Sequence, residues 1–265
     1  MTVQLDSRRR AMLAEMGIRW PEPLARADAG EPEPSPMQES LREPAPEPVR
    51  PTRILPAAQP AAAGARTAGA MAAEASPIEQ MPWDELRQAV AGCRACQLCA
   101  GRRNTVFGVG DLKADWLVVG EAPGENEDLQ GEPFVGAAGK LLDNMLKALG
   151  LDREHKVYIA NVLKCRPPAN RNPLPQEVAQ CEPFLRRQIQ LLQPRIILAM
   201  GRFAVQSLLG SNDPIGRLRG KVHRHGEIPV VVTYHPAYLL RNPADKARAW
   251  DDLCLALDAL GRQPG

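Results

Sequence analysis

The chain has 265 residues, of which 33 are basic and 31 acidic, so its net charge is only +2. A charge so close to balance excludes any argument for a nucleic-acid partner from the total alone. No stretch approaches the roughly 18 consecutive apolar residues of a membrane span, and the N-terminus lacks the apolar core of a secretion signal. We therefore expect a cytoplasmic protein that does not enter a membrane.

Residues 1–20 predict a short amphipathic helix. Its apolar side chains Met12, Leu13 and Met16 recur at helical spacing. Because a helix of this length is marginal on its own, we expect it to pack against another surface. That surface could belong to a protein partner or to the chain's own domain.

Residues 21–80 predict a disordered linker rich in proline and alanine. Of the 26 prolines in the chain, 11 fall between residues 21 and 60, and no aromatic residue lies between Trp20 and Trp83. A segment so poor in large apolar groups cannot offset the entropy cost of ordering itself.

From Trp83 onward, short apolar runs alternate with helical stretches. The runs typical of buried strands cover residues 116–119, 157–160, 196–199 and 230–233. The stretches with helical periodicity cover residues 138–149, 175–192, 202–209 and 244–260. Such alternation predicts a parallel sheet with helices on both faces. We expect one α/β domain over residues 81–262, a three-layer α/β/α sandwich with a central, mostly parallel four-stranded sheet.

The unusual residues of the chain follow the predicted strands. A loop of residues 120–127 follows the first strand, Asn161 ends the second, Gly201 follows the third and residues 235–241 follow the fourth. In an open parallel sheet, ligands bind at the carboxyl ends of the strands. The glycine-rich loop is not expected to bind phosphate, because it lacks both a Gly-Lys-Ser/Thr ending and a GxGxxG pattern and carries several carboxylates.

The cysteines of a protein in a reducing compartment are expected to be ligands, catalytic groups or core residues rather than disulfides. Cys93 and Cys96 in one segment, and Cys165 and Cys181 in another, supply four thiolates. Four thiolates can hold a tetrahedral metal ion or a cubane cluster, and the spacing alone leaves zinc and [4Fe-4S] open. Cys96 and Cys99 form a second CxxC motif that competes with Cys93 and Cys96 as a pair of ligands.

Three segments carry a resemblance to a known family: GEAPGENEDLQGEPFVGAAGKLLDNML, YIANVLKCRPPANRNPLPQEVAQC and HPAYLLR. In order and spacing they are similar to the family 4 iron–sulfur uracil-DNA glycosylases of bacteria and archaea. The resemblance runs from about Cys93 to the last predicted helix. It implies the uracil-DNA glycosylase fold and an enzyme of base excision repair that acts on uracil-containing DNA. Such an enzyme flips uracil out of DNA and hydrolyses its N-glycosidic bond, which leaves an abasic site. Nothing in the sequence suggests more than a monomer.

The same resemblance implies which residues recognise the base. Phe134 would stack on the flipped ring, and Asn161 would pair with its polar edge, because an amide offers a donor and an acceptor side by side. Glu127 would shape the pocket near uracil C5 and exclude the methyl group of thymine. Ala122 stands where better-known uracil glycosylases carry an aspartate, so water activation must differ here.

The resemblance also implies roles in catalysis and DNA binding. His235 would contact uracil O2, where negative charge develops, and Glu121 would orient the attacking water. Leu239 would probe the duplex as the base leaves, with Arg241 near a phosphate. The resemblance favours a structural [4Fe-4S] cluster over zinc, held by Cys93, Cys96, Cys165 and Cys181.

Two other functions stay open. Relatives that trap uracil covalently carry an inserted basic loop with an extra histidine after the third cysteine, whereas here Cys165 is followed by Arg-Pro-Pro-Ala-Asn-Arg-Asn-Pro. A non-catalytic iron–sulfur module that only binds DNA is expected to lose Asn161 or His235, and both are present. Hydrolysis with turnover is therefore favoured.

Overall fold

The computed structural model describes residues 77–261. The helix predicted within residues 1–20 and most of the predicted linker lie outside the described residues. The described part begins with a short helix, α2 (Pro77–Gln80), just before the predicted start of the domain at residue 81. Ile78 and Met81 pack against an apolar cluster of the following helices, which accounts for the order of this segment. Among the described residues, no helix is both long enough and apolar enough to cross a membrane.

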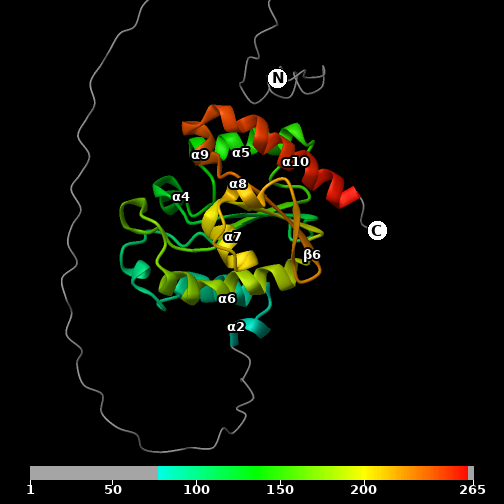
Figure 1. Cartoon of the computed structure of the whole chain (residues 1–265). Helices are drawn as coiled ribbons and strands as arrows, with labels where there is room; N and C mark the ends of the chain where they lie inside the picture. The colour runs from blue at the N-terminus through cyan, green and yellow to red at the C-terminus, as the bar shows by residue number, and fades with distance from the viewer. Residues whose placement is uncertain (1–76, 262–265) are drawn as a thin grey trace, which may run out of the picture. The chain divides into compact units, whose positions relative to one another are not determined.

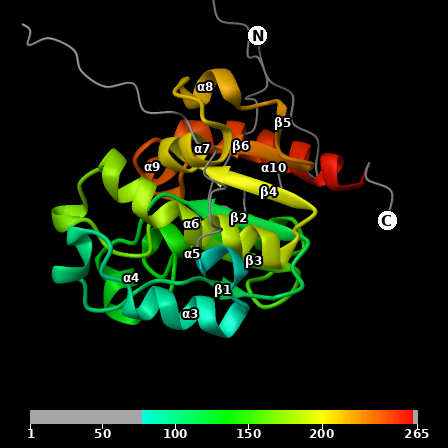
Figure 2. The ribbon, with the colours of Figure 1, turned by 90° about the horizontal axis from the view of Figure 1, so that it is seen from below.

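A six-stranded sheet forms the centre of the domain, in the order β1-β3-β2-β4-β6-β5 (Figure 2). Its strands are β1 (Val109–Gly110), β2 (Trp116–Gly120), β3 (Val157–Asn161), β4 (Ile196–Met200), β5 (Val222–His225) and β6 (Ile228–Thr233). The neighbours β3, β2, β4 and β6 are parallel. This confirms the four-stranded parallel core predicted from the sequence.

The two edge strands, β1 and β5, are the part of the sheet that the sequence does not predict. Both pair antiparallel with their neighbours. The first has only two residues, and the second reads Val-His-Arg-His with every other side chain exposed. Edge strands with a solvated side lack the continuous apolar run of a strand buried on both faces, so they leave little signal.

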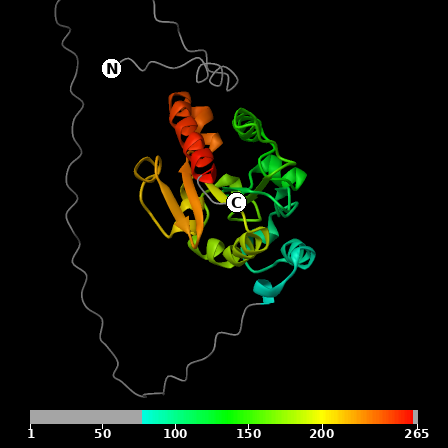
Figure 3. The same ribbon diagram turned by 90° about the vertical axis from the view of Figure 1, so that its right-hand side faces the viewer.

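Helices cover both faces of the sheet (Figures 1 and 3). One face carries α5 (Ala137–Ala148), α9 (Pro236–Arg241) and α10 (Lys246–Gly261), and the other carries α6 (Pro175–Leu192) and α7 (Arg202–Leu209). In β2, Trp116 and Val118 belong to the core of the first face, and Leu117 and Val119 belong to that of the second. None of these four side chains is more than 1% exposed. This alternation produces the predicted three-layer arrangement.

Shorter elements complete the domain. Helix α3 packs against α6 through Leu86 and Val90, in a third apolar cluster that also contains Cys165 and Cys181. The bounds are α3 (Trp83–Gly92), η1 (Gln97–Ala100), α4 (Glu125–Gln130), η2 (Pro168–Asn170), α8 (Ile215–Leu218) and η3 (Pro243–Asp245).

The strand register brings the functional loops together. Gly120 at the end of β2 is paired with Asn161 at the end of β3, and Met200 of β4 is paired with Thr233 of β6. Because the parallel strands end level with one another, the loops that follow them leave the sheet at one edge.

Candidate functional site

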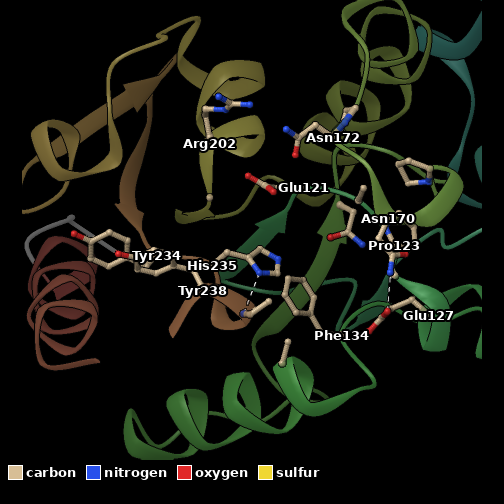
Figure 4. Close-up of a pocket in the computed structure, with 18 of the residues that line it drawn as sticks. Glu121, Pro123, Glu127, Phe134, Asn170, Asn172, Arg202, Tyr234, His235 and Tyr238 are labelled. Atoms are coloured by element: carbon tan, nitrogen blue, oxygen red, sulfur yellow. Dashed lines mark hydrogen bonds between the residues drawn. The ribbon is translucent and has the colours of Figure 1, made fainter. Parts of the chain in front are cut away.

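A pocket of about 690 Å³ opens at the carboxyl ends of the parallel strands. The loops after β2, β3, β4 and β6 all contribute to its walls. The predicted site residues in its lining are Glu121, Ala122, Glu127, Phe134, Asn161, His235 and Arg241. Figure 4 shows side chains from several elements around this common space.

Asn161 and Phe134 form a buried part of the pocket wall. Asn161 is 2% exposed, and its Oδ1 atom accepts no hydrogen bond from any of residues 77–261. An unpaired buried acceptor costs about 1–3 kcal/mol, so a donor from a bound molecule at this position would be stabilising. Gly120 leaves the space for it, since an added Cβ would overlap Asn161 Oδ1 and lie 2.5 Å from Cζ of Phe134.

His235 follows β6 and lies beside the ring of Phe134. The two rings are stacked, with centroids 5.3 Å apart and an interplanar angle of 25°. The Nδ1 atom of His235 accepts a hydrogen bond of 3.2 Å from the backbone N–H of Ala237, which assigns the hydrogen of the neutral ring to Nε2. Burial lowers the pKa of His235 to about 4. The imidazole is therefore neutral at pH 7 and can donate one hydrogen bond.

Glu121 follows β2 and is held against the first turn of α7. Its carboxylate accepts a hydrogen bond of 3.1 Å from the backbone N–H of Phe203. Burial raises the pKa of Glu121, while the N–H groups of Phe203 and Arg202 oppose that shift. An added Cβ on Gly201 would lie 2.6 Å from Oε1 of Glu121, so glycine is needed beside it. The carboxylate is thus fixed in the wall, where it can orient a water molecule.

Glu127 joins two loops of the pocket. Its Oε2 atom accepts a hydrogen bond of 3.0 Å from Gly124 N–H, and its Oε1 atom accepts bonds of 3.0 and 3.4 Å from the N–H groups of Val135 and Gly136. The carboxylate therefore fixes the start of α4 to the segment just after Phe134. It shapes the wall through the backbone rather than by presenting a free charge.

Helix α9 places its two leucines differently. Leu239 is 1% exposed and belongs to the apolar core beneath α5 and α10. To probe a DNA duplex as the sequence predicts, the side chain of Leu239 would first have to leave this core. Leu240 is 43% exposed, and Arg241 is exposed at the pocket. The sequence alone does not show which of two consecutive leucines is buried, because that depends on how the helix is rotated against the core.

A second cavity is lined by cysteines from two distant segments. These are Cys93, Cys96, Cys99, Cys165 and Cys181. The Sγ atom of Cys165 accepts a hydrogen bond of 3.1 Å from Nη1 of Arg102, and that of Cys181 accepts one of 3.2 Å from the N–H of Lys164. The four predicted ligands therefore lie together, with Cys99 close by.

Two thiols of this second cavity have raised pKa values. Burial raises the pKa of Cys165 and raises that of Cys181 to about 12, while Arg102 beside the first and Lys164 beside the second oppose these shifts. Within residues 77–261, no group of three or more His, Cys, Asp or Glu side chains could hold a single metal ion as placed.

Other pocket residues were not predicted. Arg202, Tyr234, Tyr238, Asn170 and Asn172 all line it. Arg202 and Tyr234 could have been found, since they adjoin Gly201 and His235, which follow predicted strands. The two asparagines come from the long segment after β3, and nothing in the sequence indicates how that segment folds back over the pocket.

Comparisons with known proteins give a consistent picture. A family model described as the uracil DNA glycosylase superfamily matches residues 107–254. The type-4 uracil-DNA glycosylase of Archaeoglobus fulgidus is 49% identical over 168 residues, which cover 60% of this chain and 84% of the relative. That of Sulfurisphaera tokodaii is 47% identical over 60% of this chain and 76% of the relative. That of Saccharolobus solfataricus is 42% identical over 68% of this chain and 86% of the relative.

Proposed function

The chain belongs to the uracil DNA glycosylase superfamily, within its type-4 group, and we propose that it removes uracil from DNA by hydrolysing the N-glycosidic bond. The observation that carries this proposal is the unpaired amide oxygen of Asn161 beside the ring of Phe134 in the pocket wall. An aromatic face and an amide with an available acceptor allow a flipped base to be recognised by stacking and by hydrogen bonds to its polar edge. The product is an abasic site, the substrate of the later steps of base excision repair.

Base recognition follows from these two side chains. Uracil presents the N3–H donor beside the O4 acceptor, and the amide of Asn161 can accept from the first and donate to the second. Phe134 would cover one face of the ring. The wall held by Glu127 would exclude thymine, because its backbone contacts leave it little freedom to move away from an added methyl group.

The reaction breaks the bond between uracil N1 and the sugar carbon C1′. The electron pair of that bond leaves with uracil, and the resulting negative charge spreads to O2. The oxygen of a water molecule bonds to C1′, and in our proposal Glu121 orients this water and accepts its proton. The Nε2–H group of His235 would donate to O2, and a positioned donor of this kind is worth about 2.7–4 kcal/mol of barrier.

The exposed end of α9 would contact the DNA strand. Arg241 lines the pocket mouth and would pair with a phosphate. Leu240 takes the place that the sequence suggested for Leu239, because it offers an exposed apolar side chain on the same helix. Such a side chain can fill the space that a flipped base leaves in the duplex.

We propose that Cys93, Cys96, Cys165 and Cys181 hold a [4Fe-4S] cluster. Four thiols that line one cavity match the ligand set of such a cluster, and the N–H groups of Arg102 and Lys164 directed at sulfur suit its charged thiolates. When bound, the cluster would supply structural cross-linking of α3, α6 and the segment after β3.

We expect protein purified anaerobically to be brown, with broad absorbance near ~400 nm and bound iron. The Cys181→Ser variant should lose this absorbance, because one ligand is removed. Cys99→Ser should keep it, and Cys254→Ser on α10 serves as a second control. Absorption spectra and metal analysis check the expectation, and a colourless protein with stoichiometric zinc would contradict it.

We expect Gly120→Ala to lower kcat/KM for uracil excision by about 100-fold, the loss typical of a misplacement of about 1 Å. The new Cβ would push on Asn161 and Phe134 together, so the base could no longer be stacked and read at once. Gly101→Ala, where no atom of the described residues lies within 4 Å of the added Cβ, is the matched control. Steady-state kinetics of both variants test this expectation. Equal kcat/KM values for Gly120→Ala and Gly101→Ala would mean that the pocket wall tolerates the methyl group.

The test of the function is incubation of the purified protein with an end-labelled oligonucleotide that contains one uracil, followed by alkali. Cleavage at uracil with many turnovers supports hydrolysis, and an oligonucleotide with thymine at the same position should stay intact. A protein–DNA species that survives denaturation would instead indicate covalent trapping. Binding with neither outcome would indicate a non-catalytic module.

A further inference from the structure

Phe134 has a backbone conformation that non-glycine residues rarely adopt. Its φ angle is 56°, in the left-handed region, and its side chain is only 4% exposed. A bulky residue stays in this region only where its surroundings hold it there, and such residues concentrate at functional sites. The question is which groups hold Phe134, because its ring position depends on this backbone angle.

On the C-terminal side, the backbone is held by a carboxylate. Glu127 accepts hydrogen bonds from the N–H groups of Val135 and Gly136. This side belongs to the pocket wall already described.

The carbonyl groups before and after the Cα atom of Phe134 are held by a guanidinium. Arg153 donates from Nη1 to the carbonyl oxygen of Pro133 at 2.9 Å and from Nη2 to that of Phe134. Its Nε atom donates to Asp143 of α5, and this contact fixes the orientation of the guanidinium group. A planar guanidinium can bind two adjacent carbonyls and a carboxylate at once, whereas the ammonium of lysine is a point charge without this geometry.

The packing around this contact leaves the Phe134 peptide little room to move. A Cβ added to Gly139 of α5 would overlap the carbonyl of Phe134, so α5 lies directly against the peptide that Arg153 binds. Arg153 itself lies in the connection between α5 and β3 and is not part of the pocket lining. Its contact with the pocket wall is therefore indirect, through the carbonyl groups of Pro133 and Phe134.

We propose that Arg153 is a positioning residue for uracil recognition, which holds the Pro133–Phe134 backbone so that the Phe134 ring stays in the pocket wall beside His235. The inference rests on the proposed function, because it assigns the stacking of uracil to Phe134. Without the guanidinium, the Phe134 peptide relaxes toward negative φ and the ring leaves its stacked position.

The kinetic test is a double-mutant cycle in the complete holoprotein. Arg153→Met should lower the single-turnover rate of uracil excision about 10- to 100-fold. Phe134→Ala removes the group through which Arg153 acts, so adding Arg153→Met to it should change the rate less than twofold. Arg153→Lys keeps the charge and should recover only part of the rate. Arg195→Met, which removes an arginine that donates to the carbonyl of Leu260 instead, should leave the rate unchanged.

The second readout does not depend on activity. With four phenylalanines in the chain, selective 13C labelling should resolve the ring signals of Phe134, which are shifted by its stacking on His235. We expect Arg153→Met and Arg153→Lys to move these signals toward unstacked values and Arg195→Met to leave them in place. Arg153→Lys supplies the comparison if the methionine variant does not fold.

The outcomes separate this inference from the proposed function. Equal rate losses on removing Arg153 with and without Phe134, or unmoved ring signals, would overturn the positioning role. A wild-type protein that excises no uracil would defeat the proposed function, while a shift of the Phe134 signals in the Arg153 variants would still support the positioning role.

Discussion

Replacing Asn161 by alanine is expected to lower kcat/KM for uracil excision by at least about 100-fold. The variant loses an acceptor for N3–H and a donor for O4, and each polar group of the base left unpaired in a dry site costs about 1–3 kcal/mol. The fold should change little, because Oδ1 of Asn161 has no hydrogen-bond partner among the described residues. Affinity for DNA without uracil should stay near that of the wild type, since phosphate contacts supply it.

Two companion variants sharpen this test. Asn161→Asp keeps the size of the side chain, but its carboxylate presents only acceptors. Its activity should therefore be as low as that of the alanine variant. Asn212→Ala, in an exposed loop, is the control for loss of an amide elsewhere. Excision kinetics and thermal unfolding are measured on all three. Wild-type kcat/KM in Asn161→Ala would remove the amide from the mechanism.

The parallel core could be predicted because its residues carry a strong local signal. The strands β2, β3 and β4 are buried at every position, so they read as continuous apolar runs. Helix α6 begins at Pro175, a residue favoured in the first turn, and its apolar periodicity predicts its full length. Strand β5 gives no such signal, since the pairing of an exposed edge depends on its neighbour β6 and not on its own composition.

The pocket could be predicted only in part. Asn161 ends the buried strand β3 and His235 lies two residues beyond β6, where parallel topology gathers functional groups, but their roles followed only from the family resemblance of the surrounding motifs. The inward phase of Leu239 and the contact between Arg153 and the backbone of Phe134 depend on how whole elements pack. Both are features of tertiary packing. No local sequence pattern around residue 153 predicts its contact with residue 134.

Replacing His235 by alanine is expected to slow excision by about 100- to 1,000-fold, the usual cost of losing a donor aimed at developing negative charge. DNA affinity should be kept, because the ring contacts Phe134 and the backbone of Ala237 rather than a surface that faces the duplex. His225→Ala on β5 is the matched control, since that imidazole also contacts a backbone group but lies outside the pocket lining.

The pH dependence distinguishes a neutral donor from a charged one. An imidazole with an ordinary pKa near 6.5 would change charge between pH 5 and 8. The pKa of His235 is lowered by burial to about 4, so the ring stays neutral through this whole range. The ratio of the wild-type rate to the His235→Ala rate should therefore be constant from pH 5 to pH 8. A ratio that rises or falls around pH 6.5 would mean that the imidazole is protonated near neutrality, and charge stabilisation at O2 would then have to come from an imidazolium.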